Sequence, residues 1–225
     1  MNPKVCAAVT GRTLEEVAEM IGLAENEGAD LVEVRFDYLV EAPDVKAVRG
    51  LTSLPLIATD RLPSQGGLFR GKEDDRQRTL LDAVAAGFNL VDLEMDTPRL
   101  KDSMDRLKEG NAKLILSQHS ASPLQPSEAE STLAEMRRLG PDICKLVATA
   151  KTMRDNLTCL DFLSKASQTT PTVCFCMGPL GVASRVLSPL FGGAFTYASA
   201  VKGREAAPGQ LTVAETKNIY RLLGV

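Results

Sequence analysis

Eight short runs of β-branched and other apolar residues alternate along the chain with longer segments in which apolar residues recur every three or four positions. The runs lie at 4–10, 31–38, 55–60, 90–96, 113–120, 142–150, 171–177 and 195–200. The clearest helical segments lie at 13–27, 73–86, 127–139, 152–167 and 213–222, and those after the second and fourth runs are shorter and weaker. This alternation is typical of strand and helix units that build a parallel sheet.

Two of the runs, LILS at 114–117 and VCFCM at 173–177, are nearly continuous in apolar character. Parallel strands covered on both faces have this pattern, and they are joined by right-handed crossovers through a helix. Eight units in 225 residues average about 28 residues each, which leaves no room for a second domain. We therefore predict one α/β domain over residues 1–225, a (β/α)8 TIM barrel, with a doubly wound open sheet as the alternative.

Local signals mark the ends of several predicted helices. Thr13 with Glu16, and Ser127 with Glu130, have the spacing of capping boxes at helix starts. Glycines follow the last periodic residue of four segments and predict their ends: Gly28, Gly87, Gly110 and Gly140.

Charge and cysteine usage exclude several classes of protein. The net charge is −3 and no five like charges are consecutive, so the chain lacks the basic patch of a nucleic-acid or membrane-surface binder. No apolar stretch is long enough to span a bilayer, and the first residues do not resemble a secretion signal. Five scattered cysteines and a single histidine fit neither a disulfide framework nor a zinc site. We expect a cytoplasmic protein without a metal.

Polar residues within or just after the apolar runs are the candidates for function, because active sites of such barrels lie at the carboxyl ends of the strands. They come from five runs: Glu33, Arg35 and Asp37 at alternate positions of the second, Arg61 and Gln65 after the third, His119 at the end of the fifth, Lys145 within the sixth and Arg185 after the seventh.

Lys145 is the most informative of these residues. A lysine in the middle of a covered strand has to be buried or to extend its amine to the rim, and burying an unpaired ammonium is costly. Desolvation and nearby arginines would favour the free amine, which can attack a ketone or an aldehyde. Together with His119 as a proton carrier and arginines for an anion, Lys145 indicates a Schiff-base enzyme acting on an anionic carbonyl compound.

Other interpretations of the same residues stay open at this stage. Glu33, Arg35 and Asp37 could form a structural salt-bridge ladder, and His119 could be a surface loop residue. The arginines would suit a phosphorylated sugar as well as a carboxylated ketone. A class I aldolase, which also uses a barrel lysine, is therefore an alternative function.

An ordered set of motifs resembles the type I 3-dehydroquinate dehydratase family. The motifs are EVRFD at 33–37, TDR at 59–61 with QGG at 65–67, His119, Lys145, MGPLGVASR at 177–185, FTYA at 195–198 and APGQ at 207–210. They run in the family's order over nearly the whole chain. The family also occurs fused to shikimate dehydrogenase, but this chain has neither the extra length nor a dinucleotide-binding fingerprint.

The resemblance implies dehydration of 3-dehydroquinate to 3-dehydroshikimate in the shikimate pathway, without a metal or an organic cofactor. Lys145 would form an imine with the substrate ketone, and His119 would transfer the protons of a syn elimination. The substrate-binding residues implied by the resemblance are Arg185 for the carboxylate, and Glu33, Arg35, Arg61 and Gln210 for the ring hydroxyls and the lid. Homodimers are common in the family, but no apolar stripe in the sequence identifies an interface.

Two positions depart from the family pattern. Gln65 stands where the family usually has a glutamate that pairs with the histidine, and Ala206 stands where a serine often precedes the lid glutamine by four residues. A neutral amide can still hydrogen-bond but does not favour an imidazolium. These departures also suggest a second alternative, a catalytically weakened barrel that binds a shikimate-type ligand.

Overall fold

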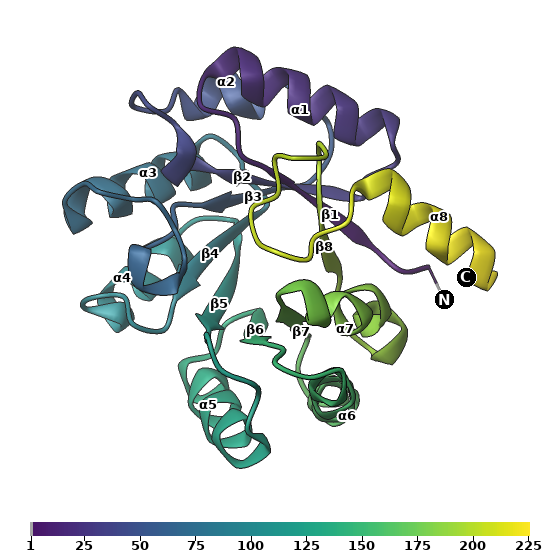
Figure 1. Cartoon of the computed structure of the whole chain (residues 1–225). Coiled ribbons are helices and arrows are strands. Elements are labelled where there is room, and N and C mark those ends of the chain that lie inside the picture. The colour runs from purple at the N-terminus through teal and green to yellow at the C-terminus, as the bar shows by residue number, and fades with distance from the viewer. Residues whose placement is uncertain (1) are drawn as a thin grey trace.

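The computed structural model describes residues 2–225, and in it eight parallel strands form a central barrel surrounded by helices (Figure 1). The strands are β1 (Val5–Val9), β2 (Leu31–Arg35), β3 (Leu56–Thr59), β4 (Leu90–Glu94), β5 (Lys113–His119), β6 (Ile143–Thr149), β7 (Thr172–Met177) and β8 (Thr196–Ser199). The helices are α1 (Leu14–Asn26), α2 (Val45–Arg49), α3 (Glu73–Ala85), α4 (Leu100–Lys108), α5 (Pro126–Leu139), α6 (Arg154–Ala166), α7 (Val182–Leu187) and α8 (Val213–Leu223). The predicted (β/α)8 barrel is confirmed.

The strands are hydrogen-bonded in the order β7-β6-β5-β4-β3-β2-β1-β8, so every strand from β1 to β7 neighbours the next one in the sequence. The barrel closes at the seam between β7 and β8, where the Ala194 backbone N–H donates to Thr172 O at 2.9 Å. The helices after the second and fourth strands are indeed short, with five residues in α2 and nine in α4.

The second strand is shorter than its apolar run. It ends at Arg35, and Phe36–Tyr38 form a 3-10 turn that brings the Asp37 carboxylate back onto the Arg35 guanidinium. Residues 36–38 therefore form the turn that allows this ion pair and do not extend the strand. The pattern of apolar residues does not predict such an ion pair.

The capping box predicted at Ser127 is wrong, because α5 begins one residue earlier at Pro126 and its N-cap, Gln125, makes no side-chain capping bond. Proline is already restricted to a helical φ and needs no hydrogen-bond donor in the first turn. At α1, Thr13 accepts from Glu16 N as predicted, but the Glu16 carboxylate accepts from Arg12 N instead. A complete capping box is found at α8, between Thr212 and Glu215.

The alternation of side chains along the strands divides the core in two. Side chains facing outward pack against the helices, whereas those facing inward fill the barrel. At the amino-terminal end the inward layer is apolar: Cys6, Leu31, Ile57, Leu90, Ile115, Ile143, Val173 and Phe195. The inward residues two positions further along most strands are polar or charged. The barrel interior is therefore apolar at the amino-terminal end of the strands and polar toward their carboxyl ends.

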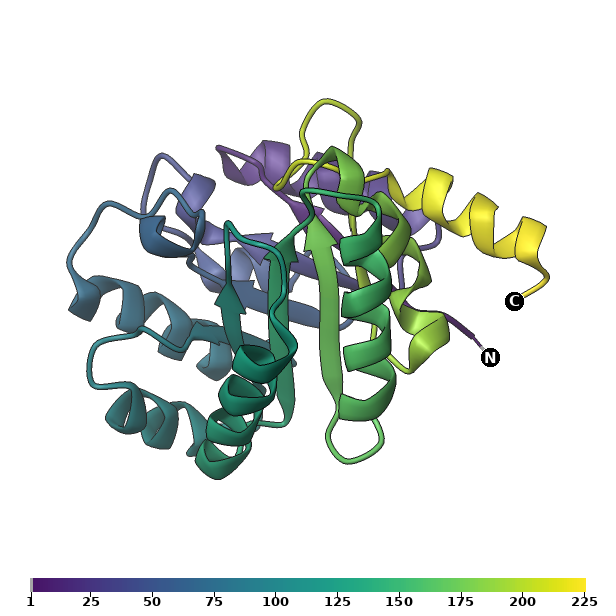
Figure 2. The same ribbon diagram turned by 60° about the horizontal axis from the view of Figure 1, so that its bottom comes forward.

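The carboxyl ends of the strands form the functional end of the barrel. In Figure 2 the strand arrowheads point to the end over which the loop between β8 and α8 passes. This loop carries the residues of the predicted lid. Among residues 2–225, no helix combines the length and the apolar character that crossing a bilayer would require.

Candidate active site

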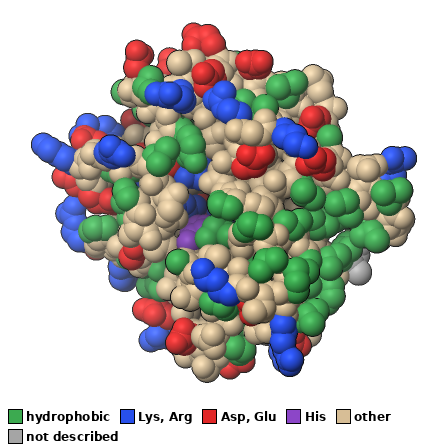
Figure 3. All heavy atoms as spheres, viewed as in Figure 1, with side chains coloured by type: hydrophobic (Ala, Val, Ile, Leu, Met, Phe, Trp, Pro, Cys, Tyr) green, Lys and Arg blue, Asp and Glu red, His purple; other side chains and the backbone are tan. Residues whose placement is uncertain are grey.

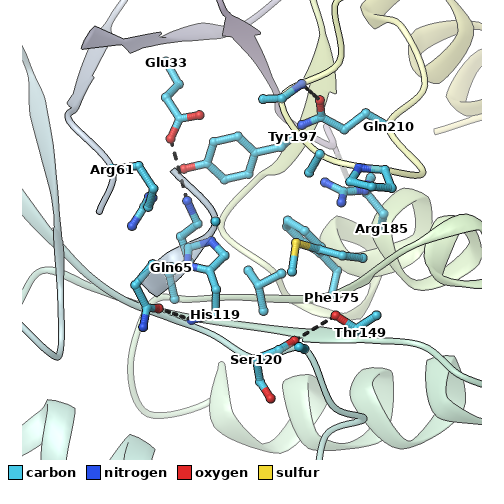
Figure 4. Close-up of a pocket in the computed structure, with 18 of the residues that line it drawn as sticks. Glu33, Arg61, Gln65, His119, Ser120, Thr149, Phe175, Arg185, Tyr197 and Gln210 are labelled. Atoms are coloured by element: carbon cyan, nitrogen blue, oxygen red, sulfur yellow. Dashed lines mark hydrogen bonds and ion pairs between the residues drawn. The ribbon is translucent and has the colours of Figure 1, made fainter. Parts of the chain in front are cut away.

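A cavity of about 280 Å³ opens at the carboxyl ends of the strands. All nine residues named from the sequence as catalytic, binding or lid residues line it, and Figure 4 shows most of them pointing into one space: Glu33, Arg35, Arg61, Gln65, His119, Lys145, Arg185, Ala206 and Gln210. In Figure 3 the histidine side chain is visible inside a hollow of this face. His119 is therefore not a free surface residue.

Lys145 extends its amine into the barrel and has only 3% of its surface exposed. Its Nζ lies 2.8 Å from Oδ2 of Asp92 and 3.7 Å from Oε1 of Glu33. The same nitrogen sits 4.2 Å from the centre of the Tyr197 ring, a cation–π geometry. The amine is thus held in a fixed position by two carboxylates and one aromatic face.

Asp92 is the centre of the buried polar network. Besides Lys145, its carboxylate binds Arg61 Nη2 at 2.8 Å and accepts from the Ser117 hydroxyl at 2.5 Å. Burial alone would raise the pKa of Asp92, but the Arg61 and Lys145 cations hold this pKa well below its usual range. Asp92 therefore stays ionised and fixes the direction of both cations.

The His119 imidazole is half-buried, with a buried Nδ1 atom, and lies among cations. Burial, with the charges of Arg61 and Lys145, lowers the pKa of His119 well below 6.5. Within residues 2–225, its Nδ1 atom has no hydrogen-bond partner. The resting imidazole is therefore neutral, the form that can accept a proton.

Arg185 presents unused hydrogen-bond donors to the cavity. Its guanidinium stacks on the Phe175 ring at 4.3 Å, and in the described chain neither Nε nor Nη2 has a partner. Burial lowers the pKa of Arg185 to about 10, so the group stays charged near neutral pH. A buried guanidinium with two free nitrogens is suited to bind a carboxylate through both oxygens.

Arg35 and Asp37 form a bidentate ion pair with N–O distances of 2.8 and 2.7 Å. Asp37 also accepts from the backbone N–H of Leu68 at 2.9 Å. The pair thus ties the end of β2 to the loop after β3, and only Arg35 reaches the cavity. The structural interpretation of this motif therefore applies to Asp37, whereas Arg35 and Glu33 face the site.

The lid loop bends over the cavity next to the start of α7. Gly178 N donates to Pro208 O at 3.0 Å, and Gly209 has a φ of +82°. A Cβ at position 209 would lie 2.3 Å from Gly178 O, so only glycine permits this approach. The Gln210 side chain accepts from Ala206 N at 2.8 Å, which keeps its amide inside the lid.

Comparison with known proteins identifies the family of this chain. The sequence profile of the type I 3-dehydroquinase family matches residues 5–225. The chain belongs to the type I 3-dehydroquinase family. A 3-dehydroquinate dehydratase from Dehalococcoides mccartyi is 37% identical over 221 residues, covering 97% of this chain and 95% of the relative.

Further relatives agree over the same length. A 3-dehydroquinate dehydratase from Methanopyrus kandleri is 35% identical over 224 residues, covering 98% of this chain and all of the relative. The crystal structure of 3-dehydroquinate dehydratase from Geobacillus kaustophilus superposes with a TM-score of 0.91 over all of this chain and 92% of that chain, at 24% identity. At that identity the superposition supports the fold.

At Gln65, where the sequence departs from the family pattern, the side-chain amide makes two hydrogen bonds. Gln65 Oε1 accepts from the backbone N–H of His119 at 2.7 Å, and its Nε2 donates to Asp96 Oδ2 at 3.1 Å. The amide therefore contacts the strand end that carries the histidine rather than the imidazole itself.

Sequence reasoning missed four residues of the polar network: Asp92, Glu94, Ser117 and Tyr197. The segment LVDLE at 90–94 carried a usable signal, because Asp92 and Glu94 alternate in an apolar run as Glu33 and Arg35 do. Tyr197 lies in the FTYA motif of the family resemblance, but its own residue type gave no such signal, since an aromatic residue on a strand is usually a core residue.

Proposed function

We propose that this chain removes water from 3-dehydroquinate and gives 3-dehydroshikimate. The observation that carries the proposal is that Lys145, His119 and Arg185 line one cavity of about 280 Å³, a size suited to one small cyclic acid. The family assignment agrees with this chemistry. The chain would act as a hydro-lyase formed by a single domain.

Lys145 is the proposed nucleophile. Its ammonium gives one proton to the neutral His119 imidazole, and the free amine attacks the substrate ketone. A second amine proton moves to the former carbonyl oxygen and His119 returns the first, so that this oxygen leaves as water and a protonated imine remains. The positive imine nitrogen withdraws electrons from the neighbouring carbon and makes its proton acidic. Asp92 and Tyr197, which already hold the amine, keep the new cation in the same place.

His119 is the proposed proton carrier. Its neutral imidazole takes the proton from the carbon next to the imine, and the released electron pair moves toward the imine nitrogen to give an enamine. The imidazolium then protonates the hydroxyl that leaves from the adjacent carbon, on the same face. Water hydrolyses the resulting conjugated imine, so that Lys145 is regenerated and the net change is loss of one water.

Substrate binding is assigned to the remaining cavity residues. Arg185 would bind the carboxylate through its unpartnered nitrogens. Glu33, Arg35 and Arg61 would contact ring hydroxyls, and Gln210 would turn into the cavity when the lid closes. The reaction as written needs no metal or organic cofactor, because the protonated imine supplies the electron sink.

We also propose where the enzyme is located, its oligomeric state and the pathway that it serves. A cytoplasmic protein, present as a monomer or a homodimer, would serve the shikimate pathway with 3-dehydroquinate as its small-molecule partner. Neither nucleic acid nor membrane binding is part of it.

A trapping experiment tests the proposal. The protein is incubated with 3-dehydroquinate and borohydride, and its mass and peptide map are measured. We expect a gain of one reduced ligand on Lys145, and an ultraviolet absorbance from the conjugated enone when borohydride is omitted. Lys145→Ala should abolish both signals, whereas Lys151→Ala, an exposed lysine just beyond β6, should change neither.

The outcomes separate the alternatives. An adduct on Lys145 without enone absorbance would indicate a binder rather than a dehydratase. A failure to trap 3-dehydroquinate, together with cleavage of a phosphorylated sugar, would indicate an aldolase and overturn the proposal.

A further inference from the structure

The loop after β3 and the loop after β4 meet at one amide. The Gln65 side chain, at the end of the 3-10 turn Pro63–Gln65, contacts the His119 backbone (Figure 4) and, on its other side, the Asp96 carboxylate. Its oxygen accepts from His119 N at 2.7 Å, while its nitrogen donates to Asp96 Oδ2 at 3.1 Å. The same Asp96 oxygen accepts from the Ser64 hydroxyl at 2.9 Å.

These contacts define what position 65 has to do. The side chain must accept from an N–H on one side and donate to a carboxylate on the other, and an amide is the group that does both. A glutamate would still accept from His119 N but would place a second carboxylate against Asp96. Like charges at this distance disfavour ionisation of both groups.

We propose that Asp96 and Gln65 act as one positioning unit for His119, in which the Asp96 carboxylate orients the Gln65 amide and the amide fixes the end of β5. The inference rests on the proposed dehydration and deepens it. Asp96 is exposed and does not line the cavity, so its effect passes through Gln65. The unit also explains how a glutamine serves at a position where the family pattern has a glutamate.

The charged and titratable groups around the imidazole come from six strands or the segments that follow them. Arg35, Arg61, Asp92 and Lys145 influence its ionisation directly, and Glu33, Arg185 and Tyr197 line the same cavity. None of these seven residues is substituted in the variants of Asp96 and Gln65. A change in kcat that depends on both positions together therefore reports the unit.

The test is a double-mutant cycle with Gln65→Glu, Asp96→Asn and the double variant, together with Asp96→Ala, measured as kcat and KM from pH 6 to pH 9. Asp96→Ala should lower kcat about three- to tenfold, the effect of losing one orienting hydrogen bond, with KM nearly unchanged. Asp96→Asn should largely restore kcat, because its carbonyl still accepts from the Gln65 amide. Asp105→Asn, an exposed carboxylate on α4, is the matched control.

The single variant Gln65→Glu should have a lowered kcat across the whole range from pH 6 to pH 9, since its carboxylate then faces the Asp96 carboxylate where the amide donated a hydrogen bond. Adding Asp96→Asn should largely restore kcat, because the introduced amide donates to the introduced carboxylate. Additive effects of the two substitutions, or wild-type kcat in Asp96→Ala, would overturn the inference.

A second measurement does not depend on turnover. Hydrogen exchange of the His119 backbone amide, followed in the ligand-free protein, should be faster in Asp96→Ala and near wild type in Asp96→Asn. Unchanged exchange in Asp96→Ala would contradict the unit even if the enzyme were active. An inactive wild type with the expected exchange would instead contradict the proposed function.

Discussion

The amine of Lys145 and the carboxylate of Asp92 lie 2.8 Å apart inside the barrel, with side-chain exposures of 4% and 0%. Asp92 binds the Arg61 guanidinium at the same distance, so one carboxylate faces two cations. Such a group determines both where the amine points and how well the fold tolerates a charged interior.

Asp92→Asn is the most direct test of this arrangement. The substitution keeps the shape but leaves Lys145 and Arg61 without their shared anion. We expect the free energy of unfolding to fall by about 3–5 kcal/mol, as for other buried pairs that lose one partner. Borohydride trapping on Lys145 should also slow. Urea unfolding and the rate of adduct formation measure the two effects, and wild-type stability would refute the central role of Asp92.

Arg185 is expected to improve binding at the expense of stability. Its guanidinium is buried with two unpartnered nitrogens, which costs free energy in the empty protein. Arg185→Met should therefore stabilise the ligand-free fold, by about 1–2 kcal/mol, while kcat/KM falls about 100-fold through loss of two charge-assisted hydrogen bonds. Thermal unfolding and steady-state kinetics check both signs, with the exposed Arg154→Met as the control. A destabilised variant would contradict this interpretation.

The barrel and its inward-facing residues could be predicted from the sequence because both follow from periodicity. Lys145 interrupts an apolar run, and its position two residues from neighbouring inward side chains fixes its direction. The partner of Lys145 could not be predicted in this way. Asp92 reaches it across β5, and strand register across three strands is a property of the closed barrel.

Contacts between loops could not be predicted from the sequence either. Gln65 and Asp96 are 31 residues apart in different βα loops, and the sequence pattern does not relate the two loops. The predicted capping box at Ser127 failed for a related reason, because a proline at the start of α5 satisfied the helix terminus by another route. Where a helix end or a loop can satisfy its hydrogen bonds in several ways, the surrounding tertiary structure determines which one is used.

His119 offers a direct measurement of its environment, because it is the only histidine in the chain. Burial and the Arg61 and Lys145 cations lower its pKa well below 6.5. In the ligand-free protein, the single imidazole signal in an NMR titration should therefore stay neutral as the pH falls through 6.5. The unfolded chain binds this proton first, so the fold should lose stability on the acid side. A titration midpoint at or above 6.5 would contradict this prediction.

Asp60 is a buried carboxyl group without a hydrogen-bond donor for its Oδ1 atom in the described chain. The nearby Arg76 cannot supply one, because its N–H groups bind Glu73, Glu94, Thr97 and the backbone oxygen of Asp60. An arginine has five such donors, and these contacts use them.

Burial, with the negative charge of Asp37, consequently raises the pKa of Asp60 from 3.8 to about 7. A carboxyl group with a raised pKa in the folded state favours folding at low pH and loses this contribution as the pH rises through the folded value. The wild type should therefore lose stability relative to Asp60→Asn between about pH 4 and pH 7, by about 2–4 kcal/mol, and the difference should level off above pH 7. Urea unfolding of both proteins at pH 4.5 and pH 8 measures it, with Asp105→Asn as the exposed control. A difference that does not change with pH would show that Asp60 is ionised throughout, and that an unassigned donor reaches its carboxylate.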